Sequence, residues 1–294
     1  MKLAYFKDPK GNFGDDLNPW LWGRLIPELL DEASETILIG VGTILEPWFV
    51  EDLPPSARKV VIGAGGGMTV PPIQIDESWS IFGVRGPLTA SYLGLDLSLS
   101  TTDPAMLIRD LWPRPAQPTG DVGFMPHHGS LSRWDWRKVC EAAGLTYLDP
   151  RAEPLETLDR IANCSKVLTE AMHGAIIADA LRVPWFPIQI SQTNYVGKWH
   201  DWAASLRMPI HFKPLPDLYD PSLRHDMVKL ALRNPRAAAY QLRQKSSRRQ
   251  HALAVNLLHQ YAENYDCYLS EDQRLDEAIC RFSSALQRLK SSQT

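Results

Sequence analysis

Residues 167–185, VLTEAMHGAIIADALRVPW, limit most strongly what this chain can fold into. The apolar run at 166–169 is typical of a buried strand, residues 170–173 of the turn that leaves it, and residues 174–182 of a helix. Pro184 stops that helix before the next apolar run begins. Because a strand that leads through a helix into another strand is the unit of parallel sheets, we predict an α/β fold.

The same alternation recurs on both sides of this stretch. Further strands are predicted at 2–6, within 35–45 and 59–69, at 81–84 and 97–105, and within 121–128, 145–150 and 183–190. Residues 112–118 contain three prolines and read as a linker, and 294 residues exceed what one hydrophobic core usually serves. We therefore predict two Rossmann-like domains, residues 1–115 and 119–210, that face each other across a cleft.

Beyond residue 210 the pattern becomes helical. Residues 251–261 and 276–290 each carry an apolar stripe at helical spacing. Such stripes usually pack against the main body, so residues 211–294 are predicted to form a helical C-terminal extension.

Composition excludes several classes of protein. No apolar run is long enough for a signal peptide or a membrane span, so a cytoplasmic protein is expected. We expect no nucleic-acid partner. The cysteines are far apart and form no metal-ligand spacing, so thiols are expected, with no metal and no cofactor. These residues are Cys140, Cys164, Cys267 and Cys280.

The charge is unevenly distributed. Residues 224–251 carry eight Lys or Arg and one acid, so this segment is +7 and the remainder of the chain is −10. Such a contrast suits either a solvated helical face or a surface that meets anionic lipid or a phosphorylated substrate. The lipid alternative predicts peripheral contact with the inner face of a membrane.

Ten tryptophans are many for this length. Several lie among polar residues, where they form either a core or a domain interface, or stack on a sugar ring in a carbohydrate site. The four with polar neighbours are Trp134, Trp136, Trp199 and Trp202.

Glu170 and His173 stand where a predicted strand passes into a helix. In open α/β sheets ligands bind at the carboxyl ends of strands, and the first N–H groups of the next helix attract anions. His173 is therefore the strongest candidate for chemistry, with Gly174 beside it at the helix start. The alternative is that this histidine only caps the helix or bonds a carbonyl.

A second strand end carries Arg85, followed by Gly86-Pro87 at the start of a helix. A guanidinium beside free N–H groups suits a carboxylate or a phosphate, unless Arg85 pairs with an acid such as Asp103. Gly65, Gly66 and Gly67 let the backbone come close to a ligand, but their spacing matches no nucleotide-binding fingerprint.

Polar residues at other strand ends are candidates for a second substrate. Asp15, Asp16 and Asn18 follow the first predicted strand and either bind a ligand or cap a helix, with capping favoured for Asp16 and Asn18. His127 and His128 end a strand of the second half, where polar turn residues are common.

The segments GDDLN, GAGGG, FGVRGPLT, TDPA and TEAMHGAIIADALRVP, in this order, resemble the polysaccharide pyruvyl transferase family. The likeness covers about residues 1–200 and is greatest to bacterial exopolysaccharide ketal-pyruvyl transferases of the succinoglycan and xanthan type. It implies a fold of the glycosyltransferase-B type, phosphoenolpyruvate as donor, and a lipid-linked oligosaccharide or polysaccharide acceptor that receives a pyruvate ketal.

The resemblance also implies roles for single residues. Family members hold the donor with arginines and use a histidine of the second domain, and the matching positions are Arg85 and His173. Many members have Arg-x-His where this chain has Ala171-Met172-His173, so one donor arginine is missing. The possible replacements are Arg109, Arg133, Lys166 and Lys198.

Ketal formation needs an acid that protonates the methylene carbon of phosphoenolpyruvate. A sugar hydroxyl then attacks, and a second hydroxyl displaces phosphate. His173, with a pKa expected near neutrality, is the predicted acid, and Glu170 either orients it or acts as base. Arg85, Gly65–Gly67 and Gly174 would bind the donor. Residues predicted to bind the acceptor are Asp15, Asp16, Asn18, Asp103, His127 and His128.

Two other functions remain open. A nucleotide-sugar-dependent glycosyltransferase of the same architecture would need an acid such as Glu170 or Asp179 for the ribose hydroxyls. A non-catalytic component of polysaccharide assembly would lack a working site, and the missing arginine keeps this alternative open. The acceptor sugar, the ketal stereochemistry and the oligomeric state cannot be predicted from the sequence.

Overall fold

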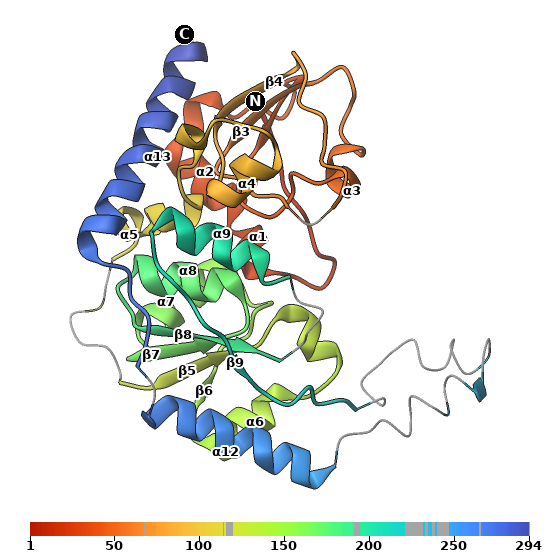
Figure 1. The fold of residues 1–294 in the computed structure, drawn as a ribbon, viewed down its shortest axis with the longest axis vertical. Coiled ribbons are helices and arrows are strands. Elements are labelled where there is room, and N and C mark those ends of the chain that lie inside the picture. The colour runs from red at the N-terminus through yellow and green to blue at the C-terminus, as the bar shows by residue number, and fades with distance from the viewer. Residues whose placement is uncertain are drawn as a thin grey trace.

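The fold consists of two parallel sheets with helices around them, as the computed structural model in Figure 1 shows. The structure describes residues 1–67, 69–113, 115, 120–190, 195–220, 232, 235–236, 239, 247–264 and 266–293. The strand order is β1-β2-β3-β4 in the first sheet and β6-β5-β7-β8-β9 in the second, and every pairing within them is parallel. The predicted α/β class is confirmed.

The strands are short. Their bounds are β1 Lys2–Ala4, β2 Thr36–Ile39, β3 Arg58–Ile62, β4 Trp79–Gly83, β5 Val122–Met125, β6 Thr146–Tyr147, β7 Lys166–Thr169, β8 Trp185–Gln189 and β9 Lys213–Pro214. In the second sheet β5 lies between β6 and β7, so the chain leaves β5 toward one edge and returns to the other side of it. The crevice at such a reversal is where α/β sheets bind ligands.

Most of the described helices connect successive strands, and two of them follow the last strand. Their bounds are α1 Phe13–Asp16, α2 Asn18–Leu25, α3 Pro47–Val50, α4 Pro87–Tyr92, α5 Ile108–Leu111, α6 Trp136–Ala143, α7 Pro154–Ala162, α8 Met172–Ala180, α9 Gly197–Ser205, α12 Arg248–Asn264 and α13 Asp272–Gln293.

Helix α8 occupies the middle of the molecule, and all nine of its residues are buried. Its sequence is apolar on every side, which suits a helix with no solvent-facing surface. One apolar cluster runs from Trp22 and Ile62 at the first sheet through Ile176 of α8 to Trp185 at the second. The two sheets therefore share a continuous core.

The C-terminal helices return along both sheets, as Figure 1 shows. Helix α12 packs on α6, and α13 packs on β4. Phe282 of α13 is fully buried and lies against Trp22, at 6.4 Å between ring centroids. Arg281 Nη2 donates to the carbonyls of Ser205 at 2.6 Å and Thr101 at 3.2 Å. The predicted helices at 251–261 and 276–290 are thus confirmed and extended.

The strand predicted at 97–105 is wrong. Two 3₁₀ turns, Leu97–Leu99 and Pro104–Leu107, replace it, with one isolated bridge between Val84 and Ser100. The reason is local: Asp96 and Asp103 accept the backbone N–H groups of the residues two further on, and these bonds favour turns over an extended chain.

Parts of two sequence predictions lie outside the described residues. These are most of the proline-rich linker, residues 112–118, and most of the basic segment, residues 224–251. Among the described helices, none is both long and apolar enough to cross a membrane.

Candidate functional site

A cavity of about 370 Å³ opens at the carboxyl ends of strands from both sheets. The first half contributes residues after β1 and β2, such as Asp15 and Thr43, and the second half residues after β5, β6 and β7, among them His127 and His173. Lys198, on α9, completes the wall. Because β5 and β7 flank the point where the strand order reverses, the second sheet presents these side chains where such sheets bind ligands.

His173 lies at the base of this pocket and is 9 % exposed. Strand β7 ends at Thr169 as predicted, but α8 begins at Met172, so His173 belongs to the first turn of the helix. Gly14 of α1 lies directly on the imidazole: a Cβ at that position would come within 2.0 Å of its Nδ1 atom. His173 Nε2 has no hydrogen-bond partner among the described residues, and Asp103 Oδ2 is 3.8 Å away.

The protonation states differ from expectation. Burial, with further contributions from Lys198 and Arg85, lowers the pKa of His173 to about 3, so its imidazole is neutral at pH 7. The prediction of a near-neutral pKa for His173 is wrong, because the imidazole is buried and two cations, Lys198 and Arg85, act on it. Burial also raises the pKa of Asp15 to about 7 and that of Asp103 to about 6. At a pH near 7 the group in this pocket that can carry an acidic proton is therefore the carboxyl group of Asp15 and not the imidazole of His173.

Lys198 is the cation of the pocket. Burial lowers its pKa, Asp15 raises it, and the structure gives its ammonium no hydrogen bond or ion pair within the described chain. The other three candidates for the missing arginine are engaged elsewhere. Arg109 pairs with Asp110 and Asp276, Arg133 pairs with Asp217 at 2.7 Å, and Lys166 donates to the carbonyl of Ala262 at 2.8 Å.

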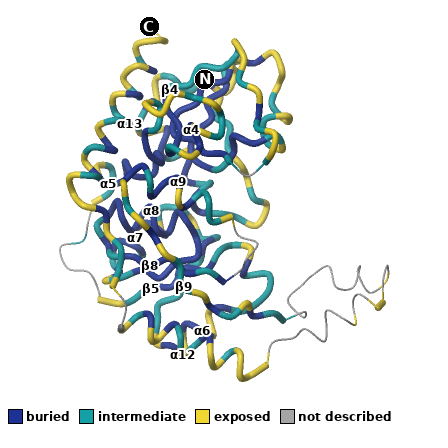
Figure 2. The backbone as a smooth tube through the Cα atoms, in the orientation of Figure 1, coloured by how far each residue is buried: buried dark blue, intermediate teal, exposed yellow. Residues whose placement is uncertain are grey.

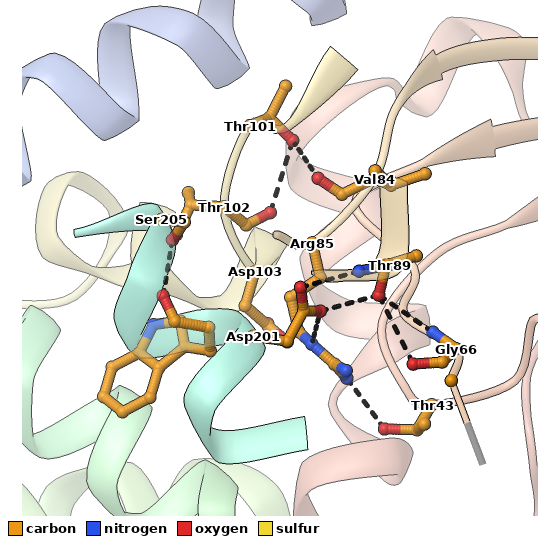
Figure 3. Close-up of polar contacts among 12 residues, drawn as sticks. Thr43, Gly66, Val84, Arg85, Thr89, Thr101, Thr102, Asp103, Asp201 and Ser205 are labelled. Atoms are coloured by element: carbon orange, nitrogen blue, oxygen red, sulfur yellow. Dashed lines mark hydrogen bonds and ion pairs between the residues drawn. The ribbon is translucent and has the colours of Figure 1, made fainter. Parts of the chain in front are cut away.

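Arg85 is fully buried and is not one of the pocket-lining residues. Figure 3 shows its polar contacts. Its Nε donates to Asp201 Oδ2 at 3.0 Å, and Nη1 donates to Thr43 Oγ1 at 2.7 Å. The same Asp201 accepts the backbone N–H and the hydroxyl of Thr89, at 2.9 and 2.6 Å. The predicted anion site beside α4 thus holds a carboxylate, but it is one from α9 and not Asp103.

Gly86 is what allows this contact. A Cβ on Gly86 would lie 2.0 Å from the carbonyl oxygen of Asp201. Helix α9 therefore packs directly against the start of α4, and Asp201 serves as its cap in place of an N-cap side chain.

The predicted donor glycines approach protein atoms. A Cβ on Gly65 would meet the guanidinium of Arg85 at 2.2 Å, and one on Gly66 the carbonyl of Leu45 at 2.6 Å. Gly67 has φ +113° and accepts the hydroxyl of Tyr195 at 2.7 Å. These three glycines close a loop over Arg85 and do not line the pocket.

Gly174 has a packing role of the same kind. A Cβ there would lie 2.6 Å from Thr169 Oγ1 and 2.9 Å from Met125 Sδ. It lets α8 lie close to β7 and β5, which sets the position of His173 one residue earlier.

Glu170 is buried and bonded to the turn after β5. Its Oε2 accepts the backbone N–H of His127 at 2.9 Å and the hydroxyl of Ser130 at 2.7 Å. Glu170 thus holds the 127–130 turn against β7. Its influence on the pocket is electrostatic, since its charge raises the pKa of Lys198.

The other predicted acceptor residues divide into two groups. Asp15, His127 and His128 line the pocket, with the two imidazole centroids 4.2 Å apart and His128 Nδ1 3.1 Å from Asp8. Burial lowers the pKa of His127 to about 2. Asp103 is fully buried behind His173, where it accepts the N–H of Ala105.

Asn18 and Asp16 serve the backbone. Asn18 is fully buried and caps no helix. It donates to the carbonyls of Asp15 and Val41 and accepts from Val41 N and Trp22 Nε1, so both its predicted roles are wrong. Asp16 accepts the N–H of Asn12 just before α1, which fits the capping alternative.

Sequence reasoning missed three residues that define the site: Gly14, Thr43 and Asp201. Gly14 and Asp201 act across the two halves, and Thr43 bonds Arg85, which is 42 residues away in the chain. No local pattern marks such contacts. Gly14 was visible only as one glycine of the predicted polar loop after the first strand. Within the described residues, no group of three or more His, Cys, Asp or Glu is arranged to hold a metal ion.

Two comparisons with known proteins bear on the family of this chain. Residues 73–192, which include Arg85 and His173, match the sequence model of the polysaccharide pyruvyl transferase family. The succinoglycan biosynthesis protein ExoV of Rhizobium meliloti (strain 1021) is 39 % identical over 218 residues, which cover 74 % of this chain and 68 % of that relative. The chain belongs to the polysaccharide pyruvyl transferase family. The pocket is therefore the candidate active site of a transferase.

Proposed function

We propose that this pyruvyl transferase moves the enolpyruvyl group of phosphoenolpyruvate onto a sugar of an exopolysaccharide repeat unit. A pyruvate ketal forms and phosphate is released. The observation that carries the proposal is that one pocket joins a neutral imidazole, a carboxyl group with a pKa of about 7 and an ammonium that has no hydrogen bond or ion pair with the described residues. The printed name of ExoV, a succinoglycan biosynthesis protein, supports an exopolysaccharide acceptor.

The architecture of the proposed enzyme is two Rossmann-like domains of the glycosyltransferase-B type, residues 1–115 and 119–210, with residues 211–294 as the extension. Two all-parallel sheets with a pocket at the carboxyl ends of both support this division. The return of α13 to the first sheet supports it as well.

Lys198 is the proposed donor-binding cation that replaces the missing arginine. Phosphoenolpyruvate carries a carboxylate and a phosphate. A partly desolvated ammonium that is not paired within the described part of the chain gains much from binding such an anion. Arg85 acts from behind the wall: its buried charge favours an anion in the pocket, and its bond to Thr43 fixes one wall residue.

Asp15 and His173 are the proposed acid and base, because their surroundings move their pKa values in opposite directions. Protonated Asp15 gives its proton to the methylene carbon of the donor, which becomes a methyl group. As the first sugar hydroxyl attacks the neighbouring carbon, His173 Nε2 takes that hydroxyl's proton. This reverses the role predicted for His173.

The second half of the reaction restores both groups. The second hydroxyl attacks the same carbon while the carbon–oxygen bond to phosphate breaks. Its proton returns to the Asp15 carboxylate, and His173 passes its own proton to the departing phosphate. The scheme consumes donor and acceptor alone, so we propose no cofactor.

The acceptor is proposed to be lipid-linked, with the +7 segment at 224–251 meeting anionic lipid on the cytoplasmic face. The motivation is the sequence charge alone, since most of this segment lies outside the described residues. Retention on anionic vesicles at low salt, lost at high salt, is the expected result. Failure to bind at low salt would remove this part of the proposal.

Thermal unfolding with different donors tests the function. A ligand at about a hundred times its dissociation constant adds roughly 2.7 kcal/mol to stability. We expect phosphoenolpyruvate to raise Tm in the wild type and not in Lys198→Met, while Lys166→Met serves as control because that side chain bonds Ala262 outside the pocket. Stabilisation by UDP- or GDP-sugars alone would favour the nucleotide-sugar-dependent glycosyltransferase.

The glycosyltransferase alternative has less structural support. Asp179 is fully buried and accepts Trp185 Nε1 at 2.8 Å and the N–H of Ser270 at 2.9 Å. It therefore anchors the C-terminal segment and has no oxygen free for a ribose. The non-catalytic alternative predicts that His173→Ala leaves cellular polysaccharide unchanged while deletion of the whole chain does not.

A further inference from the structure

Two aromatic side chains stand exposed at the pocket wall. Phe6 is 37 % exposed and Trp48 is 43 % exposed, and both line the cavity that contains His173. Their rings meet edge to face, with centroids 5.5 Å apart and planes at 89°. Trp48 comes from α3 and Phe6 from the loop after β1, so separate elements bring them together.

This exposure is unlike that of the tryptophans predicted as sugar-stacking candidates. Trp136, Trp199 and Trp202 are at most 2 % exposed and belong to the core. Trp48 instead leaves a large apolar surface in water beside a polar pocket. Burial of that surface by a ligand is favourable, and exposed apolar surface at a pocket commonly marks a binding site.

The rings around Trp48 leave room for a flat partner. Its two aromatic neighbours, Phe6 and Phe49, lie at 89° and 77° to the indole, at 5.5 and 5.7 Å. Neither of these rings is stacked parallel to it. The exposed part of Trp48 is therefore accessible to a partner from outside, and the C–H face of a pyranose is a suitable one.

The volume of the cavity also bears on where a saccharide would bind. A cavity of about 370 Å³ is near the lower end of the range of about 300–1,000 Å³ for ligand pockets. The donor would occupy the base beside His173 and Lys198, and a chain of several sugars cannot fit behind it. The sugars that do not react must lie across the opening, where Phe6 and Trp48 are exposed.

We propose that Phe6 and Trp48 form an acceptor subsite that stacks on a pyranose ring of the saccharide. This inference rests on the proposed function where it identifies the bound saccharide as the acceptor. Binding of a saccharide to the two rings does not require that function. Polar groups for the hydroxyls line the same pocket: Asn12 and Asp15, joined at 2.6 Å, and His128, whose Nδ1 lies 3.1 Å from Asp8. The aromatic surface gives affinity and the polar groups orient the ring.

The test measures saccharide binding without donor. The probe is a set of succinoglycan fragments freed of pyruvate by mild acid, and calorimetry gives Kd for each variant. We expect Trp48→Ala and Trp48→Leu to weaken binding at least about tenfold, which corresponds to about 1.4 kcal/mol, because an aromatic anchor that the ligand buries is worth at least this much. Trp48→Phe, which keeps a flat ring, should bind within about threefold of the wild type.

Two controls separate the possible outcomes. Trp134→Ala removes a tryptophan that packs on His251, away from the pocket, and should leave Kd unchanged. The Tm shift by phosphoenolpyruvate should be the same in Trp48→Ala as in the wild type. Three results would each overturn the subsite. Trp48→Ala could bind the saccharide as tightly as the wild type, Trp48→Leu and Trp48→Phe could lose the same affinity, or the wild type could fail to bind. If phosphoenolpyruvate does not raise the Tm of the wild type, that result would instead count against the proposed function.

Discussion

His173 and Asp15 face one pocket with the reverse of their usual protonation. A histidine with a pKa of about 3 is a neutral acceptor, and a carboxyl group with a pKa of about 7 is a proton donor at physiological pH. An anionic donor would raise both values, and Asp15 would remain the more easily protonated group. The acid is therefore assigned to Asp15 and the base to His173.

The pH profile follows from this assignment. Since the active form has Asp15 protonated and His173 neutral, kcat/KM should be highest between about pH 3 and 7 and fall tenfold per pH unit above about 7. Asp15→Asn should lower kcat by about 10²–10⁴ and remove the alkaline limb. The phosphate of the donor titrates near pH 6, so its own protonation is followed by ³¹P NMR and taken into account. An unchanged limb in Asp15→Asn would assign it to another group.

The position of a functional residue could be predicted where a local sequence pattern marks it. The strand end at Thr169 was predicted correctly and put His173 just beyond it, although His173 belongs to the first turn of α8 and not to the turn before it. Its pKa was not predictable, since it depends on burial by α1 and on charges from α4 and α9. Lys198 was only one of four cations until the fold showed which of them lines the pocket.

At the level of elements, α9 fixes the start of α4. Asp201 caps α4 through Thr89 and forms an ion pair with Arg85, and all three side chains are buried. The sequence correctly indicated an anion beside Arg85 and the start of α4. It could not show that the anion belongs to the protein, because residues 85 and 201 are far apart in the chain.

Loss of this carboxylate should be costly. Asp201→Ala leaves a buried guanidinium without its counter-ion, which typically costs about 3–5 kcal/mol. We expect a large fall in Tm, measured by circular dichroism, and a partial recovery in Asp201→Ala/Arg85→Met. Asp217→Ala breaks an exposed pair with Arg133 and should cost at most about 1 kcal/mol. Equal effects of Asp201→Ala and Asp217→Ala would refute the capping role.

The contact of α1 with the imidazole gives a second test at this scale. Gly14→Ala would place a methyl group 2.0 Å from His173 Nδ1, so α1 or the imidazole must move. We expect kcat to fall by about 10²-fold, as for a misplacement of about 1 Å at a reacting group. Gly23→Ala, in α2 with no atom within 4 Å of the new Cβ, should be neutral or stabilising. Activity assays of the two variants with matched circular dichroism spectra decide the point.

The whole molecule is held together by one core. The cluster around Trp22, Ile176 and Trp185 joins both sheets, and α13 carries the chain back to the first. Two sheets and the helical C-terminal extension were predictable from the strand and helix alternation. The shared core was not, because periodicity tells which face of an element is apolar and not which partner covers it.

A shared core predicts cooperative unfolding. Scanning calorimetry should show a single transition whose calorimetric and van't Hoff enthalpies agree, as for one cooperative unit. Phe282→Ala, which removes a buried ring of α13, should lower that single Tm without splitting the peak. Two resolved transitions in the wild type would show that the sheets unfold independently.

The central claim is transfer of pyruvate from phosphoenolpyruvate to a sugar, and labelled donor tests it most directly. The protein is incubated with [2-¹³C]phosphoenolpyruvate and pyruvate-free succinoglycan fragments, and the purified saccharide is examined by ¹³C NMR. The account predicts a labelled ketal carbon bonded to two sugar oxygens, with one phosphate released per ketal, and little label in Asp15→Asn or Lys198→Met. A saccharide without ¹³C, from protein that is folded and binds the fragments, would contradict it.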